Sequence, residues 1–331
     1  MTKLRLGWKI VAALGLSAAV WAFGAERPLL AAEAPSEIRL DYAYYNPVSL
    51  LIKEKAWVED EFKADGIAVR WVLSLGSNKA LEFLNAGSLD FGSTAGAAAL
   101  LGRINGNPIK SIYVYSKPEW TALVTTKEST IDSVADLKGK RIAVTRGTDP
   151  HIFLVRALQG AGLTEKDVTL VLLQHHDGRA ALDKGDVDAW AGLDPMMAQA
   201  EIENADRIFF RDPDLNTYGV LNVREAFATR NPLLVGRVLA VYERGRRYAL
   251  EHPDELKAVI AKAARLSDAV AARQLERTDL RDAAIGEKQR RTIEAAGLAL
   301  QQAGVIASDV DVPATVTSLI DPQYTAKLAL H

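Results

Sequence analysis

Hydroxyl and amide side chains recur in turns that immediately precede segments with a helical pattern. The turns contain Tyr45 and Asn46, Ser77 and Asn78, Ser93 and Thr94, Thr145 to Thr148, His175 to Arg179, and Asp194. The first backbone N–H groups of a helix have no partner within it and lie at the positive end of the helix dipole. Such turns therefore suit a bound anion, although any single residue of this kind could simply cap its own helix. Their repeated occurrence predicts one binding site built from several turns.

Catalytic and metal-binding patterns are weak in this sequence. His175, His176 and Asp177 form the only histidine cluster, and we expect them on an extended segment, where adjacent side chains point apart. No metalloprotease, nucleophile-elbow, phosphate-loop or dinucleotide-binding motif is present. The absence of cysteine excludes disulfides, thiolate metal sites and cysteine nucleophiles. We therefore expect no catalytic residues, no bound metal and no cofactor.

Composition and charge are those of an ordinary globular protein. Hydrophobic residues make up 49% and charged residues 25%, and 40 Lys+Arg against 42 Asp+Glu give a net charge of −2. The densest basic patch, Arg244 to Arg247, is typical of a solvated helix face, so nothing indicates nucleic-acid binding. A chain of 331 residues can bury one large core or two ordinary ones.

The N-terminus has the pattern of a secretory signal. Lys3, Arg5 and Lys9 precede the apolar run 10–23, which at 14 residues is shorter than the roughly 20 that a membrane span needs. The alanines at 31, 32 and 34 offer a cleavage site after Ala32 or Ala34. We expect a signal peptide over 1–34, with a retained membrane anchor as the alternative. Because no cysteine lies at the cleavage point, a lipid anchor is not expected, and the mature protein would diffuse freely in a bacterial periplasm.

A short phrase occurs twice and predicts two similar halves. Gly87 with Asp90 is matched by Gly185 with Asp188, 98 residues later (185 minus 87). In each copy a helix ends at the glycine, a strand follows, and a polar turn comes next. In the first copy we expect the strand at 89–91 and the turn at 92–96. A unit of this kind used twice predicts two α/β lobes with a crevice between them.

The rest of the chain alternates in the same way. Expected strands of the first lobe are 38–44, 67–73, 89–91, 109–115 and 121–126, with helices at 47–64, 78–84 and 95–104. Expected strands of the second lobe are 140–145, 168–173, 187–191 and 207–211, with helices at 150–161, 179–184 and 196–204. From 231 onward the pattern is almost wholly helical. We expect a first lobe of 35–128 and 218–331, a second lobe of 129–217, and two crossings that form a hinge.

Ligands of open α/β sheets bind beyond the carboxyl ends of the strands, so the polar turns should converge there. Asp149 and Asp194 would repel an anion, and we expect them to cap helices unless the ligand also carries an amine. Tyr45 and Trp190 could pack on the tail of a ligand, and Trp190 could equally belong to the core.

Three phrases carry a family resemblance: 76–94 (GSNKALEFLNAGSLDFGST), 136–148 (DLKGKRIAVTRGT) with His151, and 177–190 (DGRAALDKGDVDAW) with Asp194. They resemble the aliphatic-sulfonate, taurine and nitrate type of periplasmic solute-binding protein, which supplies an ABC transporter. The resemblance implies a two-lobed type II periplasmic-binding fold, each lobe a mostly parallel sheet flanked by helices. It places ten residues in the ligand cleft, to which the turn analysis adds Tyr45 and Asn46: Ser77, Asn78, Ser93, Thr94, Thr145, Gly147, Thr148, His151, Trp190 and Asp194. Asn78 stands where relatives often have proline, and 44–46 replaces a commoner loop with Gln or Gly.

The resemblance implies a monomeric binding protein, not an enzyme, that passes a small organic anion to a membrane permease and its ATPase. An aliphatic sulfonate is the expected ligand. Alternatives are nitrate, taurine, or a heterocycle such as a thiamine or flavin precursor, with 44, 45, 120 and 190 as stacking aromatics. A pyrimidine-precursor synthase is disfavoured by the lack of cysteine. A transcription regulator would need a helix-turn-helix where the signal peptide is expected.

Overall fold

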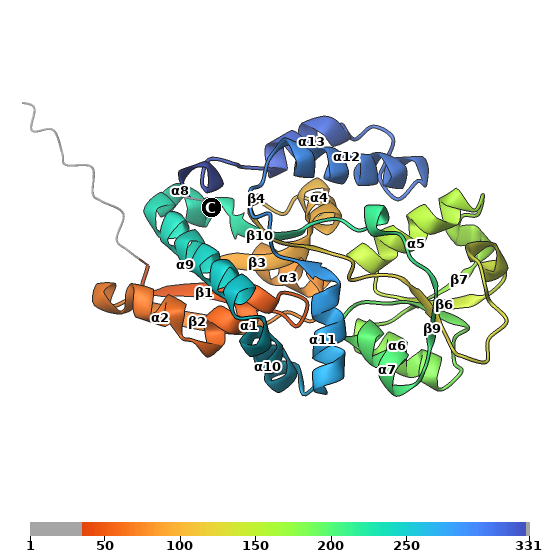
Figure 1. Cartoon of the computed structure of the whole chain (residues 1–331). Helices are drawn as coiled ribbons and strands as arrows, with labels where there is room; N and C mark the ends of the chain where they lie inside the picture. The colour runs from red at the N-terminus through yellow and green to blue at the C-terminus, as the bar shows by residue number, and fades with distance from the viewer. Residues whose placement is uncertain (1–34, 329–331) are drawn as a thin grey trace, which may run out of the picture. The chain divides into compact units, whose positions relative to one another are not determined.

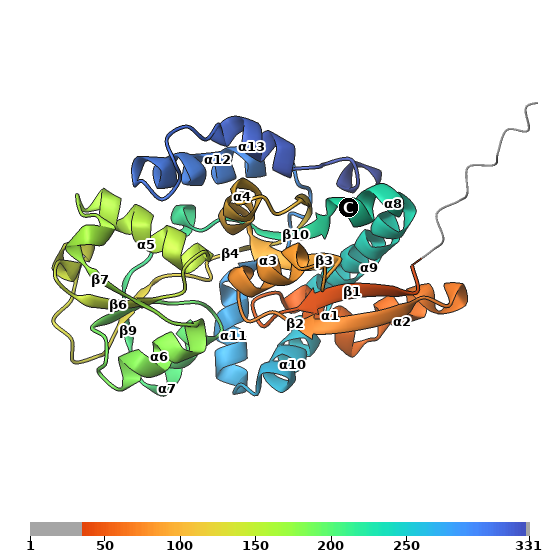
Figure 2. The same ribbon diagram turned by 180° about the vertical axis from the view of Figure 1, so that it is seen from behind.

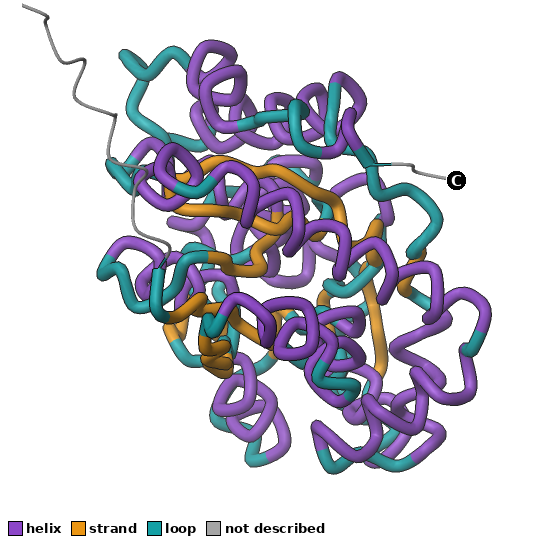
Figure 3. Tube along the Cα trace, turned by 90° about the vertical axis from the view of Figure 1, so that its left-hand side faces the viewer, coloured by secondary structure: helices purple, strands orange, loops and turns teal. Residues whose placement is uncertain are grey.

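The computed structural model describes residues 35–328. The expected signal peptide and the last three residues lie outside this range. Within it, the strands form two sheets with helices on their faces, as Figures 1 and 2 show from opposite sides. In the trace of Figure 3 the strands lie inside and the helices around them. No helix in the described part is long and apolar enough to cross a membrane.

The first sheet has six strands in the order β2-β1-β3-β10-β4-β11. β1, β2 and β3 are parallel, while β10 is antiparallel to both β3 and β4. The bounds are β1 (Glu37–Tyr42), β2 (Ala68–Leu73), β3 (Phe91–Ala95), β4 (Ile109–Pro118), β10 (Gly219–Arg224) and β11 (Thr278–Asp279). We call this sheet and its helices the first lobe.

The second sheet has five strands in the order β7-β6-β8-β5-β9. β6 is parallel to β7 and β8, and β5 is antiparallel to β8 and β9. The bounds are β5 (Leu123–Thr125), β6 (Arg141–Val144), β7 (Thr169–Leu172), β8 (Ala189–Ala191) and β9 (Arg207–Phe210). This sheet and its helices form the second lobe. In both sheets the fourth strand of the order given is antiparallel to its neighbours: β10 in the first sheet and β5 in the second. Each is the first strand after the chain crosses from the other lobe.

The strand expected at 121–126 therefore belongs to the second sheet, not the first. Leu123 pairs with Ala191 of β8 and with Phe210 of β9. The first crossing lies between Pro118 and Leu123, before the position near 128 that the sequence suggested. The local sequence at 121–126 indicates a strand, but it does not indicate which sheet the strand joins, because that depends on pairing with distant strands. The return crossing lies between β9 and β10, near the expected position.

Helices cover both sheets. Those of the first lobe are α1 (Pro47–Glu54), α2 (Trp57–Phe62), α3 (Ser77–Asn85), α4 (Gly96–Ile104), α8 (Glu225–Arg230), α9 (Pro232–Glu251) and α10 (Pro253–Ala264). Those of the second lobe are α5 (Asp149–Gly160), α6 (His175–Asp183) and α7 (Met196–Glu203). The chain ends with α11 (Asp268–Glu276), α12 (Glu287–Gln302) and α13 (Val312–Leu319). Short 3-10 turns occur at Lys63–Asp65, Val134–Leu137, Glu165–Asp167, Pro213–Leu215 and Thr325–Lys327.

The C-terminal helices contact both lobes. α11 contacts α7 of the second lobe, and α12 contacts both α4 and α5 (Figure 1). Gln159 of α5 donates a 3.0 Å hydrogen bond to the carbonyl of Ala299 in α12. Ile152 and Val155 of α5 also belong to the apolar cluster of the first lobe. The two lobes are therefore joined by packed side chains as well as by the crossings.

Both copies of the repeated phrase have the same structure. Gly87 and Gly185 adopt left-handed φ angles of +70° and +74° at the ends of α3 and α6, a conformation that glycine adopts without strain. In each copy the aspartate three residues after the glycine donates its backbone N–H to the carbonyl of an arginine near the start of the adjacent parallel strand, and its carboxylate accepts from the backbone N–H of that arginine. Asp90 does so with Arg39, and Asp188 with Arg141. The repeat therefore fixes the joint between helix and sheet.

Three expected elements differ in extent. The single helix expected at 47–64 is divided into α1 and α2, and Ala56 between them has a φ of +52°. The expected turn at 92–96 largely continues β3, whose residues pair with β10 on one side. Residues 175–177 are not extended but form the first turn of α6.

Candidate ligand-binding site

The loops that leave the carboxyl ends of β1, β2, β6, β7 and β8 enclose two cavities. The small cavity, of about 10 Å³, is lined by residues of both lobes and of the first crossing. They are Tyr45, Ser77, Trp120, Thr148, Asp149, Pro150, His175 and Leu193. Such a volume is close to the minimum for one water molecule.

The large cavity has a volume of about 360 Å³, within the range of small-molecule sites. From the first lobe it is lined by Tyr44, Tyr45, Ser74, Leu75 and the end of α10 with the two residues that follow, Ala264 to Leu266. From the second lobe it is lined by Gln174, His175, His176, Asp194, Pro195, Met196 and Gln199. Because both cavities share Tyr45 and His175, they adjoin each other.

Two helix N-termini, one from each lobe, meet at the small cavity. Ser77 is the first residue of α3, and Thr148 is the N-cap of α5. Among the described residues, no acceptor binds the backbone N–H groups of Ser77, Asn78, Thr148 or Asp149. Unpaired amides at the positive ends of two helix dipoles attract an anion. The first turn of α6, at His175, adds a third N-terminus beside the large cavity.

The hydroxyls of the small cavity differ in what they can offer. Ser77 Oγ accepts a 3.0 Å hydrogen bond from the backbone N–H of Ala95, so its own proton remains available to a ligand. Thr148 Oγ1 donates its proton to the carbonyl of Thr145 at 2.6 Å. A hydroxyl has only one proton to donate, so Thr148 can serve an anion through its backbone amide but not through its side chain.

Two aromatic rings form a wall of the small cavity. The rings of Tyr45 and Trp120 pack edge to face, with centroids 5.7 Å apart. Tyr45 donates its hydroxyl proton to the carbonyl of Ser93 at 3.0 Å, and Trp120 Nε1 donates to Asp149 Oδ2 at 2.8 Å. Burial raises the pKa of Tyr45 well above its usual range, so its hydroxyl stays neutral. Both polar atoms are occupied, and the rings present apolar surface.

His175 is the buried titratable group that both cavities share. Its side chain is 1% exposed, and its Nδ1 lies 3.2 Å from Thr145 Oγ1. Thr145 donates its only hydroxyl proton to the carbonyl of Leu173 at 2.7 Å, so the Thr145 oxygen must accept a proton from Nδ1. Burial lowers the pKa of His175 to about 3, which keeps the ring neutral. Nε2 is then an unprotonated acceptor, and it has no partner among the described residues.

Asp194 brings a carboxylate to the large cavity and pairs across the lobes. Its Oδ1 accepts from the backbone N–H of Ala198 at 2.9 Å and lies 3.3 Å from Arg277 Nη1. Arg277, which follows α11, also pairs with Glu201 of α7. Burial raises the pKa of Asp194 to about 7, and Arg277 partly opposes that rise. Asp194 therefore caps α7, as the sequence suggested, and also joins the C-terminal segment to the second lobe.

Three expected site residues lie behind the cavity wall. Asn46 accepts from Ser49 N at 3.2 Å as the cap of α1, and its amide donates to Ser93 Oγ at 2.8 Å. Ser93 also donates from its hydroxyl to the buried carboxylate of Asp41 at 2.8 Å. Thr94 Oγ1 accepts from Asn222 at 2.8 Å. Because β3 extends through these residues, Ser93 and Thr94 are held inside the sheet rather than presented from a turn.

Four more expected residues do not line either cavity. His151 lies 2.8 Å from Glu165 on the second lobe, and Gly147 forms a turn with a φ of +76°. Trp190 is fully buried in β8, and its ring lies against Gly178 of α6. Asn78 follows Ser77 on α3 and contributes its backbone amide to the N-terminus described above. Four of the twelve expected residues line a cavity: Tyr45, Ser77, Thr148 and Asp194. Thr145 lines neither cavity but orients the ring of His175 through its hydrogen bond with Nδ1.

Several lining residues carry little signal in the sequence. Leu75, Met196 and Leu266 are apolar residues next to strand or helix ends, where a core role is the default expectation. The sequence suggests Trp120 only as a stacking partner for a heterocycle. It also suggests that Asp149 caps α5, but the carboxylate of Asp149 binds the two crossings instead.

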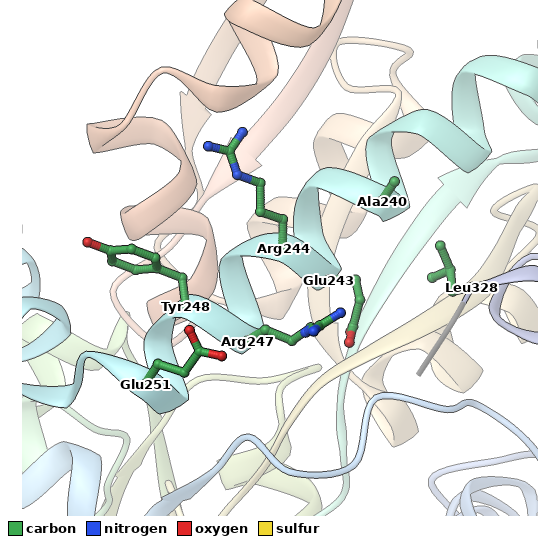
Figure 4. Close-up of a pocket in the computed structure, with 7 residues that line it drawn as sticks. All are labelled: Ala240, Glu243, Arg244, Arg247, Tyr248, Glu251 and Leu328. Atoms are coloured by element: carbon green, nitrogen blue, oxygen red, sulfur yellow. The ribbon is translucent and has the colours of Figure 1, made fainter. Parts of the chain in front are cut away.

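A further hollow, of about 390 Å³, lies along α9 (Figure 4). It is lined by Ala240, Glu243, Arg244, Arg247, Tyr248, Glu251 and Leu328, all of which Figure 4 labels. Arg244 lies over the ring of Trp57, 3.8 Å from its centroid, and Glu243 pairs with Arg246. No residue of the second lobe or of either crossing lines this hollow. The interlobe cavities are therefore better candidates than this hollow for the ligand site. Within 35–328 no group of three or more His, Asp or Glu residues could hold a metal.

The two sheets share the same order over five strands, are joined by two crossings, and enclose cavities between them. These features define the two-lobed periplasmic-binding-protein fold. The profile of the family described as "NMT1/THI5 like" matches residues 54–256. A protein of Escherichia coli K12, named for binding aliphatic sulfonates, is 30% identical over 263 residues, 79% of this chain and 80% of the relative. The chain belongs to the NMT1/THI5-like family.

Solved structures agree with this fold. The alkanesulfonate-binding protein SsuA of Xanthomonas axonopodis pv. citri, bound to MOPS, superposes with a TM-score of 0.79 at 24% identity, over 87% of this chain and 98% of that chain. The periplasmic aliphatic sulphonate binding protein SsuA of Escherichia coli gives a TM-score of 0.71 at 26% identity, over 84% of this chain and 91% of that chain. Both of these proteins, like the relative from Escherichia coli K12, are named as binding proteins.

Proposed function

We propose that this protein is the substrate-binding component of an ABC importer and binds a small organic anion, most simply an aliphatic sulfonate, between its lobes. One observation carries the proposal: two helix N-termini with unpaired amides, from opposite lobes, meet at one buried cavity. The names of its relatives support a sulfonate in particular. The anionic group would lie between α3 and α5, and the rest of the ligand would occupy the large cavity.

Binding would couple to movement of the lobes. The small cavity is too small for a sulfonate, so entry of the ligand requires α3 and α5 to separate. A ligand that contacts both helices favours the closed arrangement, because contacts with only one lobe would be equal in the open and closed states. The closed form would then deliver the ligand, chemically unchanged, to the permease and its ATPase.

The site favours binding over catalysis. Within the described residues, His175 Nε2 has no hydroxyl partner that it could activate, and Thr148 gives its proton to a backbone carbonyl. We further infer that the protein is exported by the signal peptide of 1–34 without a lipid anchor, acts in the periplasm as a monomer, and divides into two lobes that hinge at the crossings.

Calorimetric titration of the purified mature protein with alkanesulfonates, taurine and nitrate tests the proposal. Saturable binding of a sulfonate with one site per chain is the expected result. A complete lack of binding to all these anions would refute the anion site. The ultraviolet spectrum of the protein as purified provides a separate check on the heterocycle alternative. A retained flavin would absorb beyond the aromatic band, and a retained thiamine precursor would add its own absorbance within that band.

A further inference from the structure

The cavities contain a buried hydrogen-bond acceptor that an anion alone does not use. His175 Nε2 has no partner among the described residues, although the ring is 1% exposed. It points to the N-terminus of α3 in the other lobe, since a Cβ added to Gly76 would lie 3.0 Å from it. A buried acceptor without a partner is unfavourable, so a ligand that supplies a donor gains the bond.

The protonation of the ring is set by its surroundings. The chain of bonds from Nδ1 to Thr145 and on to the Leu173 carbonyl fixes the tautomer with its proton on Nδ1. A proton on Nε2 would create a cation at the N-terminus of its own helix, α6, and beside that of α3, where the dipoles oppose positive charge. Nε2 is therefore available to accept a bond and does not act as a cationic anchor for the anion.

The groups beside His175 also favour a ligand that donates a hydrogen bond. Gln174 lines the large cavity, and its side-chain oxygen is buried without a partner among the described residues. Asp194 lines the same cavity, and its carboxylate, which already pairs with Arg277, disfavours a second anionic group there. Arg265 and His176, the other basic or imidazole side chains that line this cavity, are exposed.

We propose that the ligand carries an N–H or O–H donor a few bonds from its anionic group, and that His175 Nε2 accepts from this donor and thereby selects the ligand. This inference rests on the proposed function, because it presumes an anion between α3 and α5. The favoured class is an aminoalkanesulfonate, followed by a hydroxyalkanesulfonate, and then by an alkanesulfonate of equal length.

Three sulfonates of nearly equal size provide the test: taurine, 2-hydroxyethanesulfonate and 1-propanesulfonate. Calorimetry on the wild-type protein should give at least tenfold tighter binding of taurine than of 1-propanesulfonate, with the hydroxyl compound between them. Equal binding of all three, or tighter binding of 1-propanesulfonate, would overturn the inference and leave the sulfonate function intact. Binding of none would instead refute the proposed function.

The role of His175 is tested by substitution and by spectroscopy. In His175→Leu the affinities for taurine and 1-propanesulfonate should differ by no more than about twofold. His252 is exposed and lines neither cavity, so His252→Leu should keep the wild-type ratio of these two affinities. A retained ratio in His175→Leu would refute the assignment. Nitrogen NMR of the wild-type imidazoles is independent of the folding of any variant. It should show an unprotonated Nε2 in the free protein that shifts when taurine binds but stays unprotonated, and an imidazolium in the complex would refute the acceptor role.

Discussion

Trp120 Nε1 donates a 2.8 Å hydrogen bond to Asp149 Oδ2, and this contact ties the first crossing to the second lobe. Thr217, in the second crossing, donates to the same carboxylate from its hydroxyl at 2.6 Å and from its backbone at 3.0 Å. Asp149 is the first residue of α5 and is buried. One carboxylate therefore connects both crossings to a helix whose N-terminus lines the small cavity.

Asp149→Ala should destabilise the protein by about 3 kcal/mol, since it leaves buried donors of both crossings unpaired. Ligand affinity should fall as well, because the crossings no longer hold α5 in place. Urea unfolding and calorimetry measure the two effects. Asp254→Ala, whose side chain is 96% exposed, is the matched control and should change stability by less than about 0.5 kcal/mol. Wild-type stability in Asp149→Ala would show that this carboxylate does not tie the crossings.

Gly76→Ala should weaken ligand binding at least tenfold. The added Cβ would lie 2.8 Å from Asn78 Oδ1 on the same helix and, across the interface of the lobes, 3.0 Å from His175 Nε2. Gly76 has a φ of 171°, which any residue can adopt, so the effect is steric and not due to backbone strain. Gly236→Ala in α9 meets no atom within 4 Å and should slightly stabilise the helix without changing affinity. An unchanged affinity in Gly76→Ala would show that the N-terminus of α3 is not part of the ligand site.

Arg277→Met should destabilise the protein by about 3 kcal/mol at pH 8, because it leaves the buried Asp194 charged without its partner. The loss should be smaller at pH 5, where Asp194, with a pKa already raised to about 7, is protonated. Adding Asp194→Asn should recover part of the loss at pH 8. Arg281→Met, whose side chain is 80% exposed, is the control. A loss independent of pH would show that the pair between Arg277 and Asp194 is not its cause.

Asp41 predicts a specific dependence of stability on pH. Burial raises the pKa of this carboxyl to about 6, although Ser93 N and Oγ both donate to it. The folded protein then holds a proton that the unfolded chain, with a pKa of about 4, has lost, so its contribution to stability falls as the pH rises from 4 towards 7. Relative to wild type, Asp41→Asn should gain on the order of 2 kcal/mol in unfolding free energy between pH 4 and pH 7.5. Parallel pH profiles of the two proteins would contradict this.

Local sequence signals were sufficient for most elements of the fold. Gly87 and Gly185 end helices in the left-handed conformation, and proline begins α1, α9 and α10. The resemblance to periplasmic solute-binding proteins and the repeated phrase predicted two lobes of the same kind. The exchange of hydrogen bonds between Asp90 and Arg39, and between Asp188 and Arg141, explains why that phrase occurs twice. It is a requirement of the fold in each lobe and does not involve the site.

The site was less predictable, because a residue type in a loop does not specify the direction of its side chain. Ser77 and Thr148 lie where the sequence suggested, at helix N-termini that follow strands. Ser93 and Thr94 do not, since β3 continues through them and pairs with a strand more than 120 residues away. The sequence suggests an extended segment at His175, but the first turn of α6 places this residue between the lobes.

By itself, the sequence determined what depends on neighbouring residues: the alternation of strands and helices, the glycine turns, and helix N-termini suited to an anion. The tertiary structure alone decided which strands pair across the crossings, which N-termini meet at one cavity, and which buried atoms remain without partners. Helix ends are set by interactions over a few residues, whereas a cavity between lobes is set by contacts between segments separated by much of the chain, and no local pattern records these.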